Sequence, residues 1–303
     1  MAKVGFLFPG QGAQYVGMAG ELCKQLPAAR RWFDHAADVL GYDLLQVCVE
    51  GPKERLDSTV ISQPALYVAS LAALEKLKQD DPAALESCIA AAGLSLGEYT
   101  ALTFAGAFSF EEGLRLVQQR GQAMQAAADA RAGTMISILL LAEPQLQALC
   151  DEVNAAGIGL VRIANFLCPG NLVISGDTAA CEEVERRATA AGAKTVRLAV
   201  AGAFHTPLMQ SAVDQLRHAL EQIRVQPLRV PVYANVTAKA YSGPEEVQQT
   251  LGRQVVEPVL WEPSIRAMLD AGVQRFYEIG PGRVLTGLLK RIHRSTECSH
   301  VPA

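Results

Sequence analysis

The stretch Cys88-Ile89-Ala90-Ala91-Ala92-Gly93-Leu94-Ser95-Leu96-Gly97 decides the fold class of this 303-residue chain. Its first half is small, apolar and uncharged, which predicts a buried strand, and its second half reads Gly-x-Ser-x-Gly. A strand that ends in this motif and opens into a helix is typical of a nucleophile elbow, which raises the serine hydroxyl above the end of a sheet. The flanking glycines are required because a Cβ would collide with the returning helix. The pattern therefore predicts that Ser95 forms an acyl-enzyme.

The composition permits a large core and excludes several classes of partner. Half of the residues are hydrophobic and the formal net charge is -4, so we expect no nucleic-acid and no membrane partner. No uncharged apolar run reaches the roughly 18 residues of a membrane span, and the first residues carry no signal-peptide core. The seven cysteines form no CxxC pair, which indicates reduced thiols. We expect a cytoplasmic protein that acts as a monomer.

Strand-like and helix-like segments alternate along most of the chain, which predicts an α/β class with a mostly parallel sheet. The segment from about residue 133 to 200 differs, because its order β-α-β-β-α-β is that of a ferredoxin-like unit. We expect a hydrolase-like large subdomain over residues 1–130 and 201–303 and an inserted ferredoxin-like small subdomain over residues 131–200. The tail from residue 293 to 303 is expected to be frayed.

Ser95 requires a base, and position in the chain selects one of the five histidines. His205 stands at a predicted strand-to-helix junction, directly before Thr206-Pro207, which suit an N-cap and the first residue of a helix. Such junctions are where α/β proteins gather their site residues. We therefore predict that His205 accepts the serine proton. The other histidines lie in the tail or on predicted surface positions of helices: His293, His300, His35 and His218.

The group that orients His205 is left open by the sequence. A catalytic histidine usually donates from its second ring nitrogen to a carboxylate, which fixes the tautomer. The nearest carboxylate on this side in sequence is Asp214, which lies seven residues into the following helix and is too far away. A carbonyl acceptor is the alternative.

Arg120 is predicted to lie on an apolar face. Ser109 and Glu112 have the spacing of a capping box, which begins a helix that runs to about residue 128. Leu116, Arg120 and Met124 are four residues apart and share one face of that helix. A buried guanidinium needs a carboxylate partner, which is either an internal Asp or Glu or the carboxylate of a substrate, matched by the two-pronged geometry of arginine.

Six motifs, in this order and spacing, resemble those of the malonyl-CoA:acyl-carrier-protein transacylases and the acyltransferase domains of polyketide synthases. The resemblance covers nearly the whole chain. The motifs are Phe8-Pro9-Gly10-Gln11-Gly12, Ser62-Gln63-Pro64-Ala65, Gly93-Leu94-Ser95-Leu96-Gly97-Glu98-Tyr99, Gln119-Arg120-Gly121, Gly202-Ala203-Phe204-His205-Thr206-Pro207 and Glu278-Ile279-Gly280-Pro281-Gly282.

The resemblance implies Ser95 as the nucleophile, His205 as the base and Arg120 as the residue that binds the malonyl carboxylate. It also implies an oxyanion hole built from two backbone amides and a main-chain carbonyl that orients the histidine. The remaining positions match substrate-binding residues of the family, with Phe204 in the malonyl-selecting form of its motif. These further residues are Gln11 and Leu96 for the oxyanion hole, Gln254 for the carbonyl, and Phe204, Asn165 and Gln63 for the substrate.

The implied reaction moves malonyl from malonyl-CoA to the phosphopantetheine thiol of a holo acyl carrier protein, in two steps through malonyl-Ser95. It requires no metal and no redox cofactor. The alternatives are a serine acyl hydrolase of the editing type and a catalytically inactive module that docks a carrier protein. The sequence departs from the family pattern at Leu94, where many relatives have His, at Leu167, where a second Asn is frequent, and at Ala201, where Ser is common.

Overall fold

The computed structural model describes residues 2–200 and 202–303, so Ala201 and the subdomain boundary beside it lie outside the described residues. The strands form two separate sheets. Their bounds are β1 Val4–Phe8, β2 Cys88–Gly93, β3 Gly133–Leu139, β4 Val161–Cys168, β5 Asn171–Asp177, β6 Lys194–Arg197, β7 Val232–Tyr233, β8 Arg275–Ile279 and β9 Glu297–Val301.

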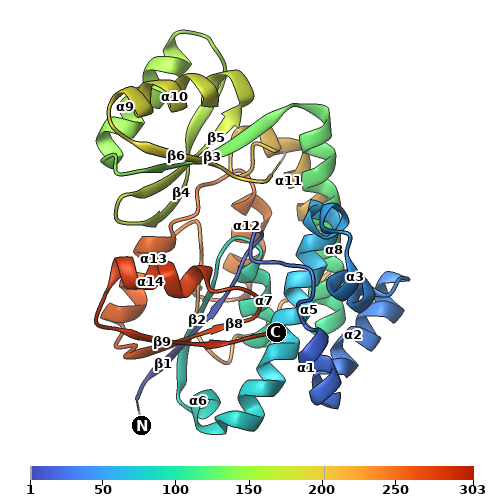
Figure 1. Cartoon of the computed structure of the whole chain (residues 1–303). Helices are drawn as coiled ribbons and strands as arrows, with labels where there is room; N and C mark the ends of the chain where they lie inside the picture. Colours follow the sequence, from blue (N-terminus) through green and yellow to red (C-terminus); the bar gives the residue numbers. More distant parts are fainter. Residues whose placement is uncertain (1, 201) are drawn as a thin grey trace.

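The helices connect these strands and cover both sheets (Figure 1). A short 3₁₀ turn, η1 (Pro207–Met209), precedes the eleventh of them. Their bounds are α1 Gly20–Gln25, α2 Pro27–Leu40, α3 Leu44–Glu50, α4 Lys53–Asp57, α5 Thr59–Asp80, α6 Pro82–Glu86, α7 Gly97–Phe104, α8 Phe110–Ala130, α9 Glu143–Ala155, α10 Thr178–Ala190, α11 Gln210–Glu221, α12 Pro244–Gln254, α13 Trp261–Asp270 and α14 Val284–Ile292.

The larger sheet is parallel throughout, in the order β7-β2-β1-β8-β9. Successive side chains of a strand point to opposite faces, and β1 shows the consequence. Phe6 and Phe8 pack into the cluster that contains the buried face of α5, whereas Leu7 packs into the cluster of α13 and α14. The sheet is therefore covered on both faces, as parallel sheets require.

The smaller sheet is antiparallel, in the order β4-β5-β3-β6. It packs against α9 and α10 through a core of its own, and Figure 1 shows this unit above the larger sheet. Its elements follow the chain as β-α-β-β-α-β, all within residues 133–197. The predicted α/β class with one parallel sheet and one ferredoxin-like sheet is confirmed, and the boundaries at residues 130 and 201 stay a prediction.

The expectation of a frayed C-terminal tail is wrong. Residues Glu297–Val301 form β9, which pairs in parallel with β8 from Arg275 opposite Glu297 to Ile279 opposite Val301. The partner strand supplies the backbone hydrogen bonds, and the tail sequence alone carries only a weak apolar signal. The tail thus completes an edge of the larger sheet.

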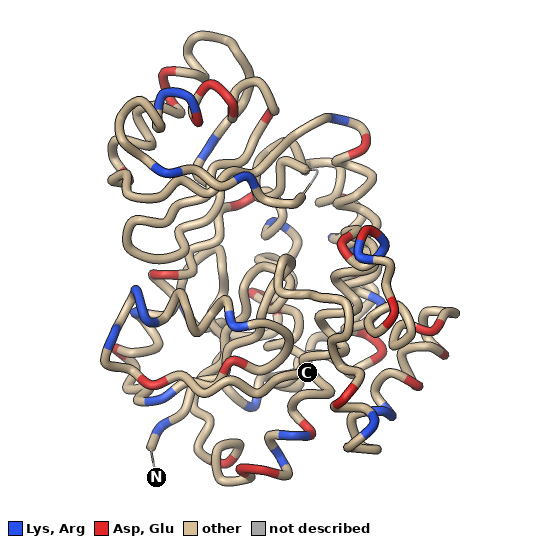
Figure 2. Tube along the Cα trace, viewed as in Figure 1, with Lys and Arg blue, Asp and Glu red and all other residues tan. Residues whose placement is uncertain are grey.

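Charged side chains are distributed over both sheets and their helices. Figure 2 shows Lys and Arg interspersed with Asp and Glu along most of the chain. Within the described residues, no helix is long and apolar enough to span a membrane.

Candidate active site

The turn between β2 and α7 has the geometry of a nucleophile elbow. Ser95 adopts a left-handed backbone conformation with a φ of 49°, which is uncommon for a residue with a side chain and is typical of strained functional positions. A Cβ on Gly93 would lie 1.9 Å from the carbonyl carbon of Gly97, and a Cβ on Gly97 would lie 2.1 Å from the oxygen of Phe8. Both glycines are therefore required by the close approach of α7 to β2 and β1.

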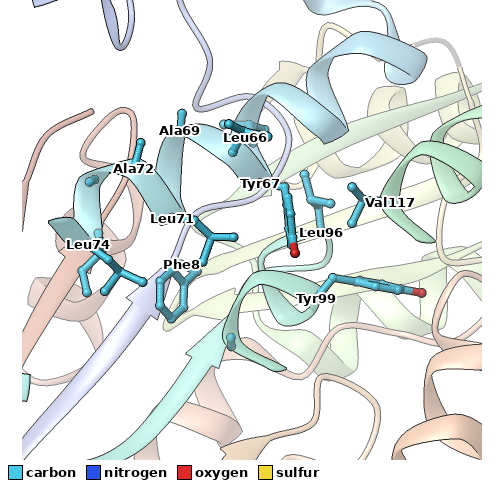
Figure 3. Packing of buried hydrophobic residues seen from close by; sticks show 14 of the residues in the cluster. Phe8, Leu66, Tyr67, Ala69, Leu71, Ala72, Leu74, Leu96, Tyr99 and Val117 are labelled. Atoms are coloured by element: carbon cyan, nitrogen blue, oxygen red, sulfur yellow. The ribbon is translucent and has the colours of Figure 1, made fainter. Parts of the chain in front are cut away.

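Dense packing surrounds the elbow. Figure 3 shows Leu96 and Tyr99 among Phe8 of β1, Tyr67 of α5 and Val117 of α8, and each of these side chains is at most 1% exposed. Close-packed interiors resist displacement. The position of the Ser95 backbone is thereby fixed from three elements that are distant in the sequence.

His205 contacts Ser95 as the sequence predicts. Its Nε2 lies 2.8 Å from the Ser95 Oγ. Its Nδ1 lies 2.9 Å from the carbonyl oxygen of Gln254 and 3.1 Å from that of Glu257. Because a carbonyl only accepts, Nδ1 carries the proton and Nε2 is free to take one from the serine. The orienting group left open above is therefore a main-chain carbonyl, and Asp214 is exposed on α11.

The electrostatic surroundings keep His205 neutral. The ring is 3% exposed, and its pKa falls from 6.5 to about 4, chiefly because burial disfavours the imidazolium and secondly because Arg120 is close. A neutral imidazole is the form that accepts a proton from serine.

Arg120 is buried at the same site, with 1% of its surface exposed. Its Nη1 donates to the side-chain oxygen of Gln63 at 2.7 Å, and its Nη2 donates to the Ser95 Oγ at 2.9 Å and to the Gln254 Oε1 at 3.0 Å. Across residues 2–200 and 202–303 no carboxylate oxygen lies within 4.0 Å of this guanidinium. The internal ion pair is thus absent from the described structure, and the buried cation faces the nucleophile.

Gln11 and Leu96 present backbone N–H groups near Ser95. Leu96 directly follows the serine, and a Cβ on Gly10 would lie 2.3 Å from the oxygen of Leu94, so the Gln11 turn touches the elbow. Within the part of the chain that is described, neither N–H donates to another group of the protein. Two unused donors on either side of a nucleophile can stabilise an oxyanion.

Of the three further residues predicted to bind substrate, the structure places Gln63 in contact with Arg120 and Phe204 in a neighbouring apolar cluster. Gln63 is fully buried and bonds to Arg120 as described, and Phe204 packs with Met124, one turn along α8. Asn165 lies on β4 opposite Val259, and no hydrogen bond in the described structure joins it to Ser95, His205 or Arg120. Its Oδ1 is buried without a partner.

Three buried groups around the elbow were missed by sequence reasoning. The side chain of Asn235 accepts from the Ser95 N–H at 2.7 Å and donates to the Gly93 oxygen at 2.8 Å. Glu98 is 0% exposed and accepts from the hydroxyl of Tyr241. The available signal was Glu98 itself, an acid in the first turn of a helix that is otherwise apolar. No group of three or more His, Cys, Asp or Glu side chains in the described ranges could hold a metal ion.

A comparison with protein families matches residues 5–302 to the acyl transferase domain. The chain belongs to this family. It is 44% identical to a probable mitochondrial malonyl-CoA-acyl carrier protein transacylase of Drosophila melanogaster, over 95% of this chain and 78% of that protein. It is 41% identical to the malonyl CoA-acyl carrier protein transacylase of Bacillus subtilis, over 97% of this chain and 92% of that protein.

Solved structures of acyl transferases agree with the fold. A malonyl-transacylase in complex with a type II PKS acyl-carrier protein superposes with a TM-score of 0.94 at 38% identity, over 99% of this chain and 96% of that one. An acyl-carrier-protein S-malonyltransferase from Bartonella henselae gives 0.94 at 37% identity, over 100% of this chain and 96% of that one.

Two of the departures noted in the sequence, at Leu94 and Leu167, border the same apolar cluster. Leu94 and Leu167 are both partly buried, and both pack against the apolar cluster that contains Tyr233, Val259 and Trp261. Polar side chains at both positions would face this cluster.

Proposed function

We propose that this acyl transferase moves the malonyl group of malonyl-CoA to the phosphopantetheine thiol of a holo acyl carrier protein, through a malonyl-Ser95 intermediate. The names of its relatives support the reaction. The observation that carries it is Arg120, a buried cation that contacts the nucleophile at 2.9 Å and has no carboxylate partner in the described ranges. A buried guanidinium without a directly bonded carboxylate is unfavourable, and the malonyl carboxylate would supply that direct partner.

The first half-reaction forms the acyl-enzyme. The Ser95 Oγ attacks the thioester carbonyl while Nε2 of His205 accepts its proton. The N–H groups of Gln11 and Leu96 donate to the developing oxyanion, and each such donor typically contributes about 10²–10³ in rate. His205 then gives the proton to the departing sulfur of coenzyme A, and Arg120 retains the malonyl carboxylate.

The second half-reaction runs the same chemistry in reverse. The thiol of the carrier protein enters, His205 takes its proton, and the thiolate attacks the Ser95 ester. Collapse of the tetrahedral intermediate returns the proton to the Ser95 Oγ. Because burial lowers the pKa of His205 to about 4, its imidazolium is more acidic than an ordinary one, which favours return of the proton.

The same residues separate this function from an acyl hydrolase. A hydrolase of neutral acyl chains gains nothing from a buried guanidinium at 2.9 Å from its nucleophile. Phe204 is 5% exposed and belongs to the buried cluster that contains Met124 of the Arg120 helix, and its matching position in the family supports a role in malonyl selection. Asn165 is a candidate for contact with a more distant part of the substrate.

The proposal extends to the cofactors, partners, oligomeric state and location of the protein. We propose that no step requires a metal or a redox cofactor, because serine, histidine and two amides supply nucleophile, base and oxyanion hole. The net charge of -4 supports a protein without a nucleic-acid or membrane partner. We further propose that it acts as a monomer in the cytoplasm.

Replacement of Arg120 tests the function. Arg120→Ala is expected to lower kcat/KM for malonyl transfer by about 100-fold or more while acetyl transfer is retained, because only malonyl presents a carboxylate. Arg115→Ala on the exposed face of the same helix is the matched control and should leave both unchanged. An equal loss with malonyl-CoA and acetyl-CoA would assign Arg120 a structural role.

A further inference from the structure

Glu98 is a buried carboxylate that the reaction described above does not use. It lies in the first turn of α7 and is 0% exposed. Its Oε1 accepts from the Tyr241 hydroxyl, its Oε2 accepts from the Gln254 Nε2, and the Asn235 N–H lies 3.3 Å from both oxygens. Hydrogen bonds of this kind stabilise the ionised carboxylate.

One amide connects Glu98 to Arg120. The Gln254 Nε2 donates to Glu98 and to the Ser95 carbonyl oxygen at 3.0 Å, while its Oε1 accepts from Arg120 at 3.0 Å. The amide dipole therefore points its positive end at the anion and its negative end at the cation. Two buried opposite charges face each other across a single side chain, so the empty pocket contains one negative and one positive charge.

Entry of a malonyl carboxylate disturbs this balance. It would add a second negative charge on the other side of Arg120, and like charges in a buried site disfavour the ionised form of each. Burial raises the pKa of Glu98 from 4.5 to about 7, although its hydrogen bonds and the nearby Arg120 lower it in part. Glu98 can therefore be protonated near neutral pH. The other titratable groups that face Glu98 are Tyr241 and Tyr99. Their pKa values are raised, so both stay neutral near pH 7.

We propose that Glu98 balances the charge of Arg120 in the empty pocket and takes up one proton from solvent when the malonyl carboxylate enters. This rests on the proposed function. Malonyl-CoA, the Ser95 hydroxyl, the Glu98 carboxylate and one solvent proton give malonyl-Ser95, the coenzyme A thiol and the Glu98 carboxylic acid. The proton resides on Oε1, where the Tyr241 oxygen can accept it, and Oε2 continues to accept from Gln254. Transfer of malonyl to the carrier thiol releases the proton.

Proton uptake on malonylation is the direct test. The enzyme is mixed with malonyl-CoA at pH 7.5 in weak buffer with a pH indicator, and malonyl-Ser95 is quantified by mass spectrometry. We expect uptake of about half a proton or more per malonyl-Ser95 in the first phase, and none with acetyl-CoA. Formation of malonyl-Ser95 without proton uptake would overturn the inference. Absence of malonyl-Ser95 itself would overturn the proposed function, and with it the inference.

Two variants assign the proton to Glu98. Glu98→Gln should abolish the uptake, whereas Glu278→Gln should retain it. Glu278 is equally buried, and among the described residues its side chain bonds only to the start of α14. Uptake that persists in folded Glu98→Gln contradicts the assignment. If Glu98→Gln does not fold, Tyr241→Phe provides the alternative test. This variant removes one hydrogen bond from the ionised form of Glu98 and so raises its pKa in the empty enzyme. The pH below which proton uptake disappears should therefore move upward, and an unchanged value would contradict the proposal.

Discussion

Ser95 and His205 are both non-glycine residues in the left-handed region, with φ values of 49° and 61°. Such conformations are unfavourable by about 1–3 kcal/mol each and persist where the surroundings impose them. The Ser95 N–H donates to the Asn235 side chain at 2.7 Å, and the His205 N–H donates to the Val255 oxygen at 2.9 Å. Each of these two residues is thus held in a strained conformation by a hydrogen-bond partner on a distant segment.

The pH dependence of transfer should follow the low pKa of His205. The base must be unprotonated, so activity is present above its pKa in the folded protein and is lost as the pH falls through it. Because that pKa is about 4, we expect the acid limb of kcat/KM to lie near pH 4 to 5. Acetyl-CoA as donor avoids any titration of the malonyl carboxyl. A limb centred near 6.5, the ordinary value, would show that the imidazole is solvated.

At the scale of elements, the site depends on how closely α7 approaches β1 and β2. The pair of glycines allows two backbones to meet with no side chain between them, and the packed Leu96 and Tyr99 keep the helix there. Any side chain at Gly97 must push α7 away from β1. The displacement would move Ser95 relative to His205, since the two residues come from different elements.

Alanine at position 97 tests this dependence. Gly97→Ala places a Cβ 2.1 Å from the Phe8 oxygen, so we expect a loss of about 2–4 kcal/mol in the free energy of unfolding and loss of most transfer activity. Gly287→Ala in α14 meets no atom within 4 Å and should be neutral or stabilising by about 0.5–1 kcal/mol. Denaturant unfolding of both variants measures the difference. Equal stability of the two would mean that the elbow can relax.

At the scale of the whole molecule, the smaller sheet contacts segments that belong to the candidate site. The β4 strand bonds to the segment before α13, through the Phe166 N–H to the Val259 oxygen at 2.9 Å and the Val259 N–H to the Ala164 oxygen at 2.8 Å. Arg131 pairs with Asp177 through two hydrogen bonds of 2.7 and 2.8 Å at the end of α8. These contacts connect the smaller sheet to the segment after the Gln254 and Glu257 carbonyls that orient His205, and to α8, which carries Arg120.

The sequence predicts what is encoded locally and misses what depends on distant contacts. The elbow, the capping box of α8 and the apolar face around Arg120 are local patterns, and each is present. The bond from Ser95 to Asn235 joins residues 140 apart, and that from Tyr241 to Glu98 joins residues 143 apart. The periodic pattern of apolar residues does not indicate which distant residues form such hydrogen bonds. The edge strand β9 was missed for the same reason, because its partner β8 lies earlier in the chain.

The most direct test of the central claim follows malonyl through the protein. Purified protein is incubated with radiolabelled malonyl-CoA, the label is mapped by proteolysis and mass spectrometry, and holo acyl carrier protein is then added. We predict label on Ser95, its loss to the carrier thiol faster than its hydrolysis, and no label on Ser95→Ala. Label that persists on Ser95→Ala, or hydrolysis faster than transfer, would contradict the account.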